Sequence, residues 1–389
     1  MLQFFARRVC PLPIIYVIIF LLSLHFALPI YITSSFLEDF VPHTLLGALY
    51  AAGSLATLAS MAIFPAFVRR FGDYRSFLIV MGAEAVALLT LAFSDSPAII
   101  IGAFIVAQVI AGSIILVTDI FLETCATAET VGRERGTALS AGSAAFLVGP
   151  PVTGLLLTNG DYWKVFLAAT AVILPIVMLA RIYLRSFADP SYVRTPYTTA
   201  FLASWRTPDL RAIFMSSFTL NVFYAWMVIF MPIYLHAHLG FSWGVIGFMF
   251  FIMLIPFVLL EAPLGIVADR LLGEKELLMI GMIIMAVSCA AMAISDSHNP
   301  AWWTFLLFVS RIGASTVEVM SETYFFKKIT GAQSSVIGFF RNARALAYII
   351  GPAIASIFLI FFPLHALFGL LGVITLSGAW WSSKIHDTR

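Results

Sequence analysis

A short set of polar and ionisable side chains interrupts the long apolar stretches of this sequence. An ionisable side chain at the centre of a membrane-spanning helix costs about 3 kcal/mol on insertion scales, so each of these residues calls for an explanation. Their side chains could orient a polar solute or carry a proton. The set comprises His25, Glu84, Gln108, Asn221, Tyr224, Arg311, Glu318, Arg341 and Arg344.

His25 and Glu84 are the candidates for carrying a proton. A histidine titrates in the physiological range, and a buried carboxyl group can take up and release a proton near neutral pH. A packing histidine, and a carboxyl group with a local hydrogen bond inside the amino-terminal half, are the alternative interpretations. Glu84 has no basic neighbour along its own apolar stretch.

Two pairs of ionisable residues have helical spacing. Arg341 and Arg344 lie three residues apart and share a helix face, so they could hold an anionic solute. Alternatively, they extend toward the cytoplasm or pair with Asp73. Arg311 and Glu318 are seven residues, or two turns, apart and form either a polar stripe for a solute or a charge pair that satisfies itself.

Composition shows which elements must position these residues. Hydrophobic residues make up 61% of the 389 residues, charged residues 11%, and the mean hydropathy is +1.00, which requires lipid as part of the solvent. The basic residues lie singly or in pairs, so nucleic acid is excluded as a partner. No GxSxG, HExxH, phosphate-binding loop or acidic metal cluster is present, and we expect no enzyme, no cofactor and no metal site.

Apolar runs of about 20 residues predict twelve membrane-spanning helices. They are too long and too continuously apolar for barrel strands, and lipid requires each backbone to satisfy its own hydrogen bonds. The first six runs are Leu12 to Ser35, His43 to Pro65, Phe77 to Phe93, Pro97 to Phe121, Thr137 to Thr158 and Trp163 to Leu184. The others are Ala212 to His236, Trp243 to Pro263, Leu277 to Ile294, Ala301 to Phe325, Ser335 to Phe361 and Leu364 to Trp381.

Positive charge predicts the orientation of the chain. Of the 22 lysines and arginines, only Lys164 falls on an outside segment and three arginines fall inside spans, if the amino terminus is cytoplasmic. The others lie on cytoplasmic segments, as the positive-inside rule requires. We expect a multi-pass protein of the inner membrane with both termini in the cytoplasm.

The two halves of the chain repeat several landmarks about 200 residues apart. Pro-Ile-Tyr occurs in the first and seventh spans, Gly-Pro in the fifth and eleventh, and a pair of acidic residues in the fourth and tenth. This period indicates a duplication, with a binding site between the copies. We predict an amino-terminal six-helix bundle over 1–185, a cytoplasmic linker over 186–211 and a carboxy-terminal bundle over 212–389. The repeated residues are Pro29 and Pro232, Gly149 and Gly351, Pro150 and Pro352, Asp119 and Glu318, and Glu123 and Glu322.

The segment from Gly265 to Lys275 carries a family signature. It reads GIVADRLLGEK and resembles the GxxxDRxGxK loop of the major facilitator superfamily. The equivalent segment from Ala66 to Arg75 keeps the second arginine and the glycine but has Arg69 in place of the family's aspartate. The resemblance covers essentially the whole chain and implies a fold of two pseudo-symmetric six-helix bundles.

The resemblance also implies roles for particular residues. The loops would form a cytoplasmic gate, in which Arg270 meets Glu318 or Glu322, Arg70 meets Asp119 or Glu123, and Asp269 lies near Gly136. The gate set is completed by Gly72, Asp73, Gly265 and Gly273. The cavity wall would include His25, Gln108, Asn221, Tyr224, Arg311 and Glu318.

The fifth span resembles, in part, the motif of the superfamily's drug and proton antiporters. Gly136, Gly149, Pro150 and Gly154 match it, whereas Ala145 and Thr153 stand where the motif has glycine. Close helix packing through small residues, including Gly351 and Pro352 in the other half, explains the pattern without antiport.

We therefore expect a secondary active transporter that moves a small organic solute by alternating access, most simply as a proton-coupled exporter. An uptake symporter or facilitator and a transporter-like receptor remain alternatives. Its partners would be a small-molecule substrate, protons and the lipid bilayer, and the protein would act as a monomer.

Overall fold

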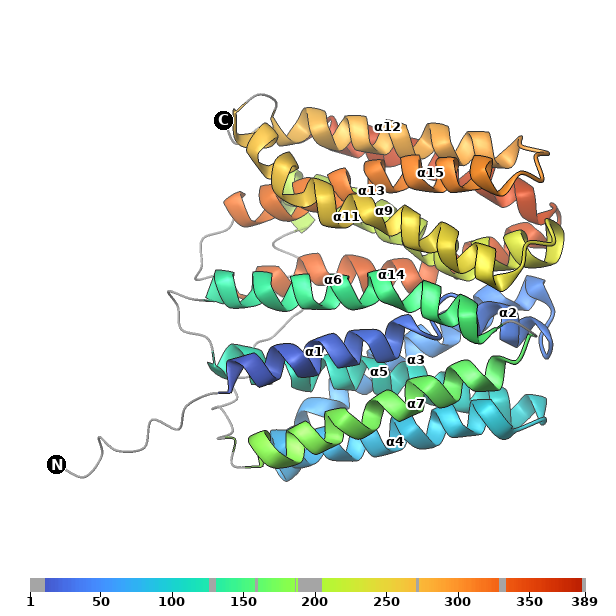
Figure 1. Ribbon diagram of the computed structural model, residues 1–389. Helices are drawn as coiled ribbons and strands as arrows, with labels where there is room; N and C mark the ends of the chain where they lie inside the picture. Colours follow the sequence, from blue (N-terminus) through green and yellow to red (C-terminus); the bar gives the residue numbers. More distant parts are fainter. Residues whose placement is uncertain are drawn as a thin grey trace.

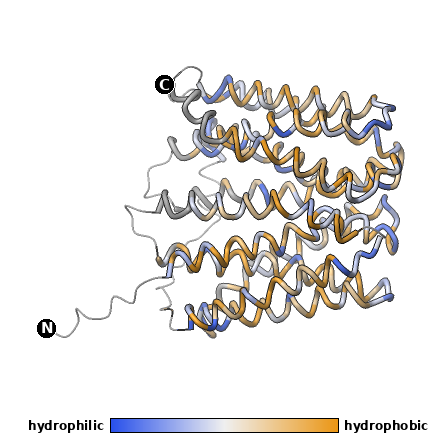
Figure 2. Tube along the Cα trace, in the orientation of Figure 1, coloured by the Kyte–Doolittle hydropathy of each residue, from blue (hydrophilic) through white to orange (hydrophobic). Residues whose placement is uncertain are grey.

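The computed structural model describes residues 11–125, 131–157, 160–185, 187, 205–270, 273–328 and 334–386. The described chain is a bundle of helices whose two ends lie at the same end of the bundle (Figure 1). We call this end the terminal face and the opposite end the far face. Hydrophilic residues gather at these two faces, and apolar residues dominate the length of the helices between them (Figure 2).

Eight helices are long and apolar enough to cross a membrane within the described part of the chain. Three shorter apolar helices, Leu12–Ala27, Ser140–Leu156 and Ala343–Leu359, accompany them. The structure thus shows an all-helical, multi-pass architecture, and the full count of twelve spans stays a prediction.

The amino-terminal half lies in the lower part of Figure 1. Its helices run antiparallel and are joined by short connections. They are α1 (Leu12–Ala27), α2 (Thr33–Glu38), α3 (His43–Phe71), α4 (Asp73–Phe93), α5 (Pro97–Cys125), α6 (Val131–Leu156), α7 (Tyr162–Leu179) and the π-helical segment η1 (Ala180–Leu184).

The carboxy-terminal half has a matching order of elements. They are α9 (Pro208–Ile229), α10 (Met231–Ile233), the π-helical segment η2 (Tyr234–His238), α11 (Trp243–Arg270), α12 (Glu274–Ala293), α13 (Pro300–Lys328), α14 (Ser334–Leu359) and α15 (Leu364–Ser382).

Proline and glycine set the breaks and turns of this bundle. Pro29 lies in the interruption between α1 and α2, and Pro232 lies in the corresponding interruption after α9. Pro150 and Pro352 lie inside α6 and α14 at equivalent places. Gly72 alone joins α3 to α4 with a φ of 80°, a left-handed conformation that favours glycine.

The halves meet along two helix crossings. α3 packs against α14, and α6 packs against α11, so each crossing joins one helix from each half. In Figure 1, α6 and α14 accordingly lie in the middle of the bundle. These crossings decide which face of the protein is sealed.

Candidate functional site

A polar cavity of about 150 Å³ lies on the inner side of the carboxy-terminal half. It is bounded by the terminal-side parts of α9, α13 and α14. Glu322 and Arg344 line it and are exposed, so solvent reaches the cavity. The lining residues are Ser217, Leu220, Asn221, Tyr224, Glu318, Ser321, Glu322, Phe340 and Arg344.

Tyr224 and Glu318 join two walls of the cavity. The Tyr224 hydroxyl on α9 donates a hydrogen bond of 2.6 Å to Glu318 Oε2 on α13. Arg311, two turns earlier on α13, is only 2% exposed and lies with its guanidinium 5.0 Å from the Phe223 ring centroid and 5.6 Å from that of Tyr224. The ring faces stabilise its charge, and no ion pair joins Arg311 to Glu318. The sequence predicted the shared helix face but not the tyrosine that connects it to α9.

The remaining lining residues supply both hydrogen-bonding and apolar surface. Asn221 lines the cavity, and its Nδ2 donates a hydrogen bond to the Ser217 carbonyl oxygen at 2.8 Å. Arg344 places its guanidinium 5.9 Å from the Tyr348 ring centroid. The wall thus presents carboxylate, guanidinium, amide and aromatic groups together, which is a lining suited to an amphipathic solute.

Glycines close the seam between the halves on the far side of this cavity. A Cβ atom on Gly47 of α3 would lie 2.0 Å from the Pro352 carbonyl oxygen on α14. At the other crossing, a Cβ on Gly247 of α11 would lie 2.5 Å from the Pro150 carbonyl oxygen, and one on Gly154 would lie 2.7 Å from that of Trp243. Because these neighbours are backbone atoms, both crossings require glycine for this close approach.

Aromatic rings extend the seal toward the far face. Tyr31 lies with its ring centroid 4.7 Å from that of Phe250 in the other half, and Tyr162 lies 6.1 Å from Trp243 in the same manner. His236 packs on Trp243 at 4.4 Å. Among the described residues, these contacts therefore close the seam between the halves at the far side.

Acidic residues lie next to this seal. Glu38 ends α2, and Asp39 follows it. Burial raises the pKa of both carboxyl groups above their ordinary values, and His236 acts in the opposite direction. No sequence pattern predicted a role for these residues, because they lie beyond the apolar runs.

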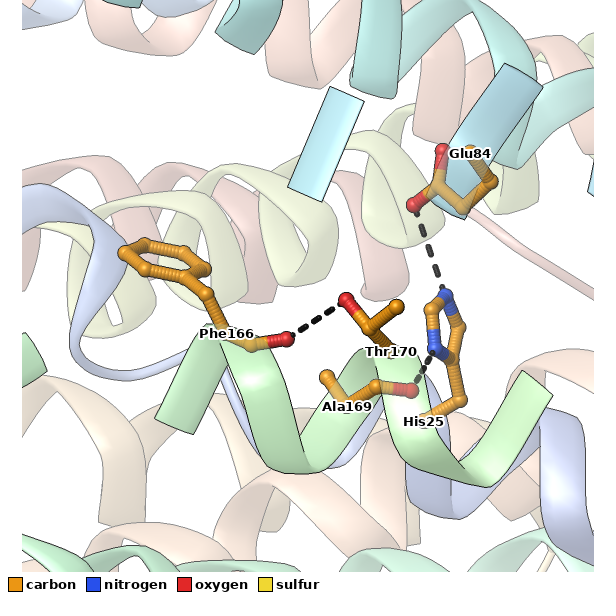
Figure 3. A network of polar contacts seen from close by, with 5 residues as sticks. All are labelled: His25, Glu84, Phe166, Ala169 and Thr170. Carbon is orange, nitrogen blue, oxygen red and sulfur yellow. Dashed lines mark hydrogen bonds and ion pairs between the residues drawn. The ribbon is translucent and has the colours of Figure 1, made fainter. Parts of the chain in front are cut away.

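His25 and Glu84 come together away from the cavity (Figure 3). His25 Nε2 on α1 lies 3.4 Å from Glu84 Oε1 on α4, and its Nδ1 lies 2.9 Å from the Ala169 carbonyl oxygen on α7. Both side chains are buried, at 1% and 3% exposure. The structure thus places His25 in the interior of the amino-terminal half and outside the cavity lining where we expected it.

One feature of the sequence could have indicated that His25 and Glu84 are neighbours. His25 lies 13 residues into α1 and Glu84 lies 11 residues into α4, counted from the terminal face. At 1.5 Å per residue, both side chains are about 16 to 20 Å deep, so matching depth marked them as neighbours. Sequence order gave no such indication.

Other predicted residues have different surroundings. Gln108 packs against Gly53 of α3, where a Cβ would lie 2.8 Å from its amide group, and its Nε2 has no hydrogen-bond partner among the described residues. Arg70 is exposed and lies 5.5 Å from the Phe71 ring centroid, and its predicted contact with Asp119 or Glu123 stays a prediction. Asp73 is fully buried in the first turn of α4.

The glycines predicted to pack helices lie in tight contacts. A Cβ on Gly149 would lie 2.6 Å from Ala27 Cβ on α1, and one on Gly351 would lie 3.3 Å from Trp226 Nε1. Gly273 is buried at the start of α12. The predictions for Glu123, Gly136, Gly265, Asp269, Arg270 and Arg341 lie outside the residues whose side chains the structure describes.

Solved structures of known proteins share this architecture. No curated relative matches the chain. Two solved structures of the nucleoside transporter NupG share the fold, both with a TM-score of 0.77. The structure of a NupG mutant has 13% sequence identity, and the match covers 95% of this chain and 98% of that chain. The other NupG structure has 14% identity, and the match covers 95% of this chain and 97% of that chain. A POT family transporter in complex with a thioalcohol-conjugated peptide has 9% identity and a TM-score of 0.75, covering 95% and 94%.

At these identities the likeness to solved structures concerns the fold. A family model described as the Major Facilitator Superfamily matches residues 14–253 and 213–387. These matches span both halves of the chain and include the cavity helices and both crossings between the halves. The protein therefore belongs to the major facilitator superfamily of membrane transporters.

Proposed function

We propose that this protein is a proton-coupled secondary transporter that exports an amphipathic organic solute across the inner membrane. The terminal face is then the cytoplasmic face, as the distribution of lysine and arginine indicates. The observation that carries the proposal is a polar cavity with exposed lining residues in one half, together with glycine crossings that close the seam between the halves at the far face.

Alternating access requires a solute site that faces one side of the membrane at a time. The cavity residues lie on helices of one half, and the far-side seal joins helices of both halves. A rocking of the halves would open the crossings of α3 with α14 and α6 with α11, and would close the terminal side. The predicted gate residues Asp269 and Arg270 belong to the loop that would lock that closed terminal side.

The lining indicates the class of solute. Leu220 and Phe340 offer apolar surface, while Asn221, Glu318 and Arg344 offer an amide, a carboxylate and a guanidinium. A solute with a ring or short apolar body and at least one polar group would use both kinds of surface. Simple ions and long lipids would leave half of the lining unused.

Export is the favoured direction because of the fifth-span pattern around Gly149 and Gly154, which resembles that of antiporters. The tight packing of these glycines against Ala27 and Trp243 explains the same pattern by structure alone. An uptake symporter or facilitator is therefore the alternative within transport. A receptor that binds without transporting is the alternative outside it.

Flux measurements on the purified full chain in proteoliposomes test the proposal. A pH gradient of either sign is imposed, and uptake of a nucleoside, a dipeptide and the amphipathic cation ethidium is followed. We expect at least one probe to move with the gradient, and we expect Asn221→Ala and Arg344→Gln to reduce its flux. Thr90→Val is the matched control, because its hydroxyl bonds only within α4, to the Val86 carbonyl oxygen.

Movement with one sign of the gradient distinguishes export from uptake. Binding of a probe without flux supports the receptor. Equal flux in the wild type and both cavity variants would show that the solute site lies elsewhere.

A further inference from the structure

The buried pair of His25 and Glu84 holds one proton. The Ala169 carbonyl oxygen can only accept a hydrogen bond, so His25 Nδ1 carries a hydrogen and donates it at 2.9 Å. Nε2 then faces Glu84 Oε1 at 3.4 Å, where a bare lone pair and a carboxylate would repel each other. A proton therefore lies between them, on nitrogen or on oxygen. Either way the pair is neutral overall, as a low-dielectric interior favours.

No other charge within the described residues compensates this pair. On α4, Asp73 and Arg75 lie in the first turn, about 16 Å and about 14 Å before Glu84 along the helix axis. On α7, Lys164 is ion-paired with Asp161 near the far face. Asp119 lies at the terminal end of α5, and the described side chains of α1 and α6 add no further charge. The proton itself is the counter-charge.

One oxygen of the pair has no hydrogen bond. Glu84 Oε2 is buried and has no partner among the described residues. Buried polar atoms in folded proteins are nearly always bonded, so this oxygen is the atom of the pair to which a water molecule would bond when the proton is exchanged.

The helix turns after His25 lead directly to the far-side seal. Ala27 lies against Gly149 of α6, and the Leu28 carbonyl oxygen accepts a hydrogen bond of 2.7 Å from Thr153 Oγ1. Tyr31 then contacts Phe250 of the other half. A shift of α1 relative to α4 and α7 would move these contacts, so the proton pair is mechanically connected to the seal.

We propose that the His25–Glu84 pair is the site that takes up and releases the coupling proton, in a bundle separate from the solute cavity. Release transfers the proton from between Nε2 and Oε1 to water and leaves a neutral imidazole beside a carboxylate, with a net charge of −1. Repulsion between the two then separates α1 from α4 and loosens the seal, and uptake reverses the step. This inference rests on the proposed proton coupling of transport.

Infrared difference spectroscopy between acidic and alkaline buffer tests the pair without any solute. In the wild-type chain we expect acidification to change a carboxyl band of Glu84 or an imidazole band of His25, and we expect this component of the difference spectrum to be missing in Glu84→Gln. Thr170→Val is the control, because the Thr170 hydroxyl bonds the Phe166 carbonyl oxygen beside the pair without touching it (Figure 3). A carboxyl band that is unchanged in Glu84→Gln overturns the inference.

Proteoliposome flux of the transported probe gives the second readout. The wild-type rate should change by at most about tenfold per unit of pH, the limit reached well to one side of the transition of a single proton. Glu84→Gln should lose this dependence and its gradient-driven flux, while keeping exchange of the probe in the absence of a gradient. Retained gradient-driven flux in that variant overturns the inference.

A second variant guards against loss of folding. His25→Asn keeps an amide N–H that can donate to the Ala169 carbonyl oxygen but removes Nε2, so it should fold and also lose the pH dependence. A normal pH dependence in His25→Asn contradicts the proposal. If no probe moves in any protein, the proposed function fails, whereas the infrared result on Glu84 still decides whether the pair titrates.

Discussion

Gly47 lies in the second turn of α3, at the point where this helix crosses α14 of the other half. A Cβ atom there would lie 2.0 Å from the Pro352 carbonyl oxygen and 2.6 Å from Ser356 Oγ. The first distance falls 1.4 Å short of the 3.4 Å at which ordinary contact begins. Ser356 also accepts a hydrogen bond of 2.9 Å from the Ala48 backbone N–H, so the crossing has both steric and polar complementarity.

The substitution Gly47→Ala should therefore disfavour the conformation that is sealed at the far face. The obstacle is a carbonyl oxygen held in a helix, which cannot turn aside as a flexible side chain could. Overpacking of this kind typically costs about 1 to 3 kcal/mol. When this cost falls on one of two conformations, it shifts their ratio about 5- to 150-fold toward the other. The variant should be open at the far face and transport poorly.

Electron paramagnetic resonance distances across the far face measure this shift. Spin labels are placed through Asp95→Cys, between α4 and α5, and His298→Cys, between α12 and α13, with the native cysteines replaced by alanine. Both positions are exposed. We expect the distance distribution to move to longer values in Gly47→Ala.

The chain offers a matched control for this substitution. Gly82 lies inside α4, and a Cβ there would meet no atom within 4 Å. Gly82→Ala should keep the wild-type distances and flux. Identical distance distributions in the wild type, Gly47→Ala and Gly82→Ala would refute the assignment of the α3–α14 crossing to the seal.

Three further predictions follow from the same structure. Tyr224→Phe removes the 2.6 Å hydrogen bond to the Glu318 carboxylate in the cavity. For a bond worth about 1 kcal/mol, the KM of the transported probe should rise about fivefold. An unchanged KM would exclude the tyrosine from the solute site. Burial raises the pKa of Glu38 at the far face, with Asp39 adding to the rise and His236 opposing it. The sealed form is therefore favoured at low pH, where the Glu38 carboxyl is neutral. It loses stability as the pH rises through the raised pKa of Glu38. Glu38→Gln should weaken this pH dependence of the spin-label distances. A pH dependence in that variant equal to that of the wild type would rule out Glu38 as its origin. Asp269→Asn should slow turnover without impairing membrane insertion, because the family loop would lose its gate contact, and normal turnover would count against a gating role.

The sequence could predict the helices but not all of their partners. Apolar runs near 20 residues, the proline breaks at Pro29 and Pro232 and the loop around Asp269 and Arg270 are local features, so they indicated an all-helical transporter fold directly. The shared face of Arg311 and Glu318 followed from helical spacing. Helical spacing could not predict that Glu318 bonds Tyr224 on another helix and not Arg311.

Distances between helices are the physical reason for this division. Spacing along one helix fixes which side chains share a face, but the rotation of each helix against its neighbours depends on how side chains fill the space between them. His25 was therefore expected at the cavity, and its helix is in fact rotated so that it meets Glu84 inside the amino-terminal half. Likewise, the sequence marked Gly149 and Gly154 as small residues, while Gly47 and Gly247 gained their role only where backbones from the two halves touch. Lipid and hydrogen bonding determined the helices from the sequence alone, and packing between them decided which polar groups meet and which face is closed.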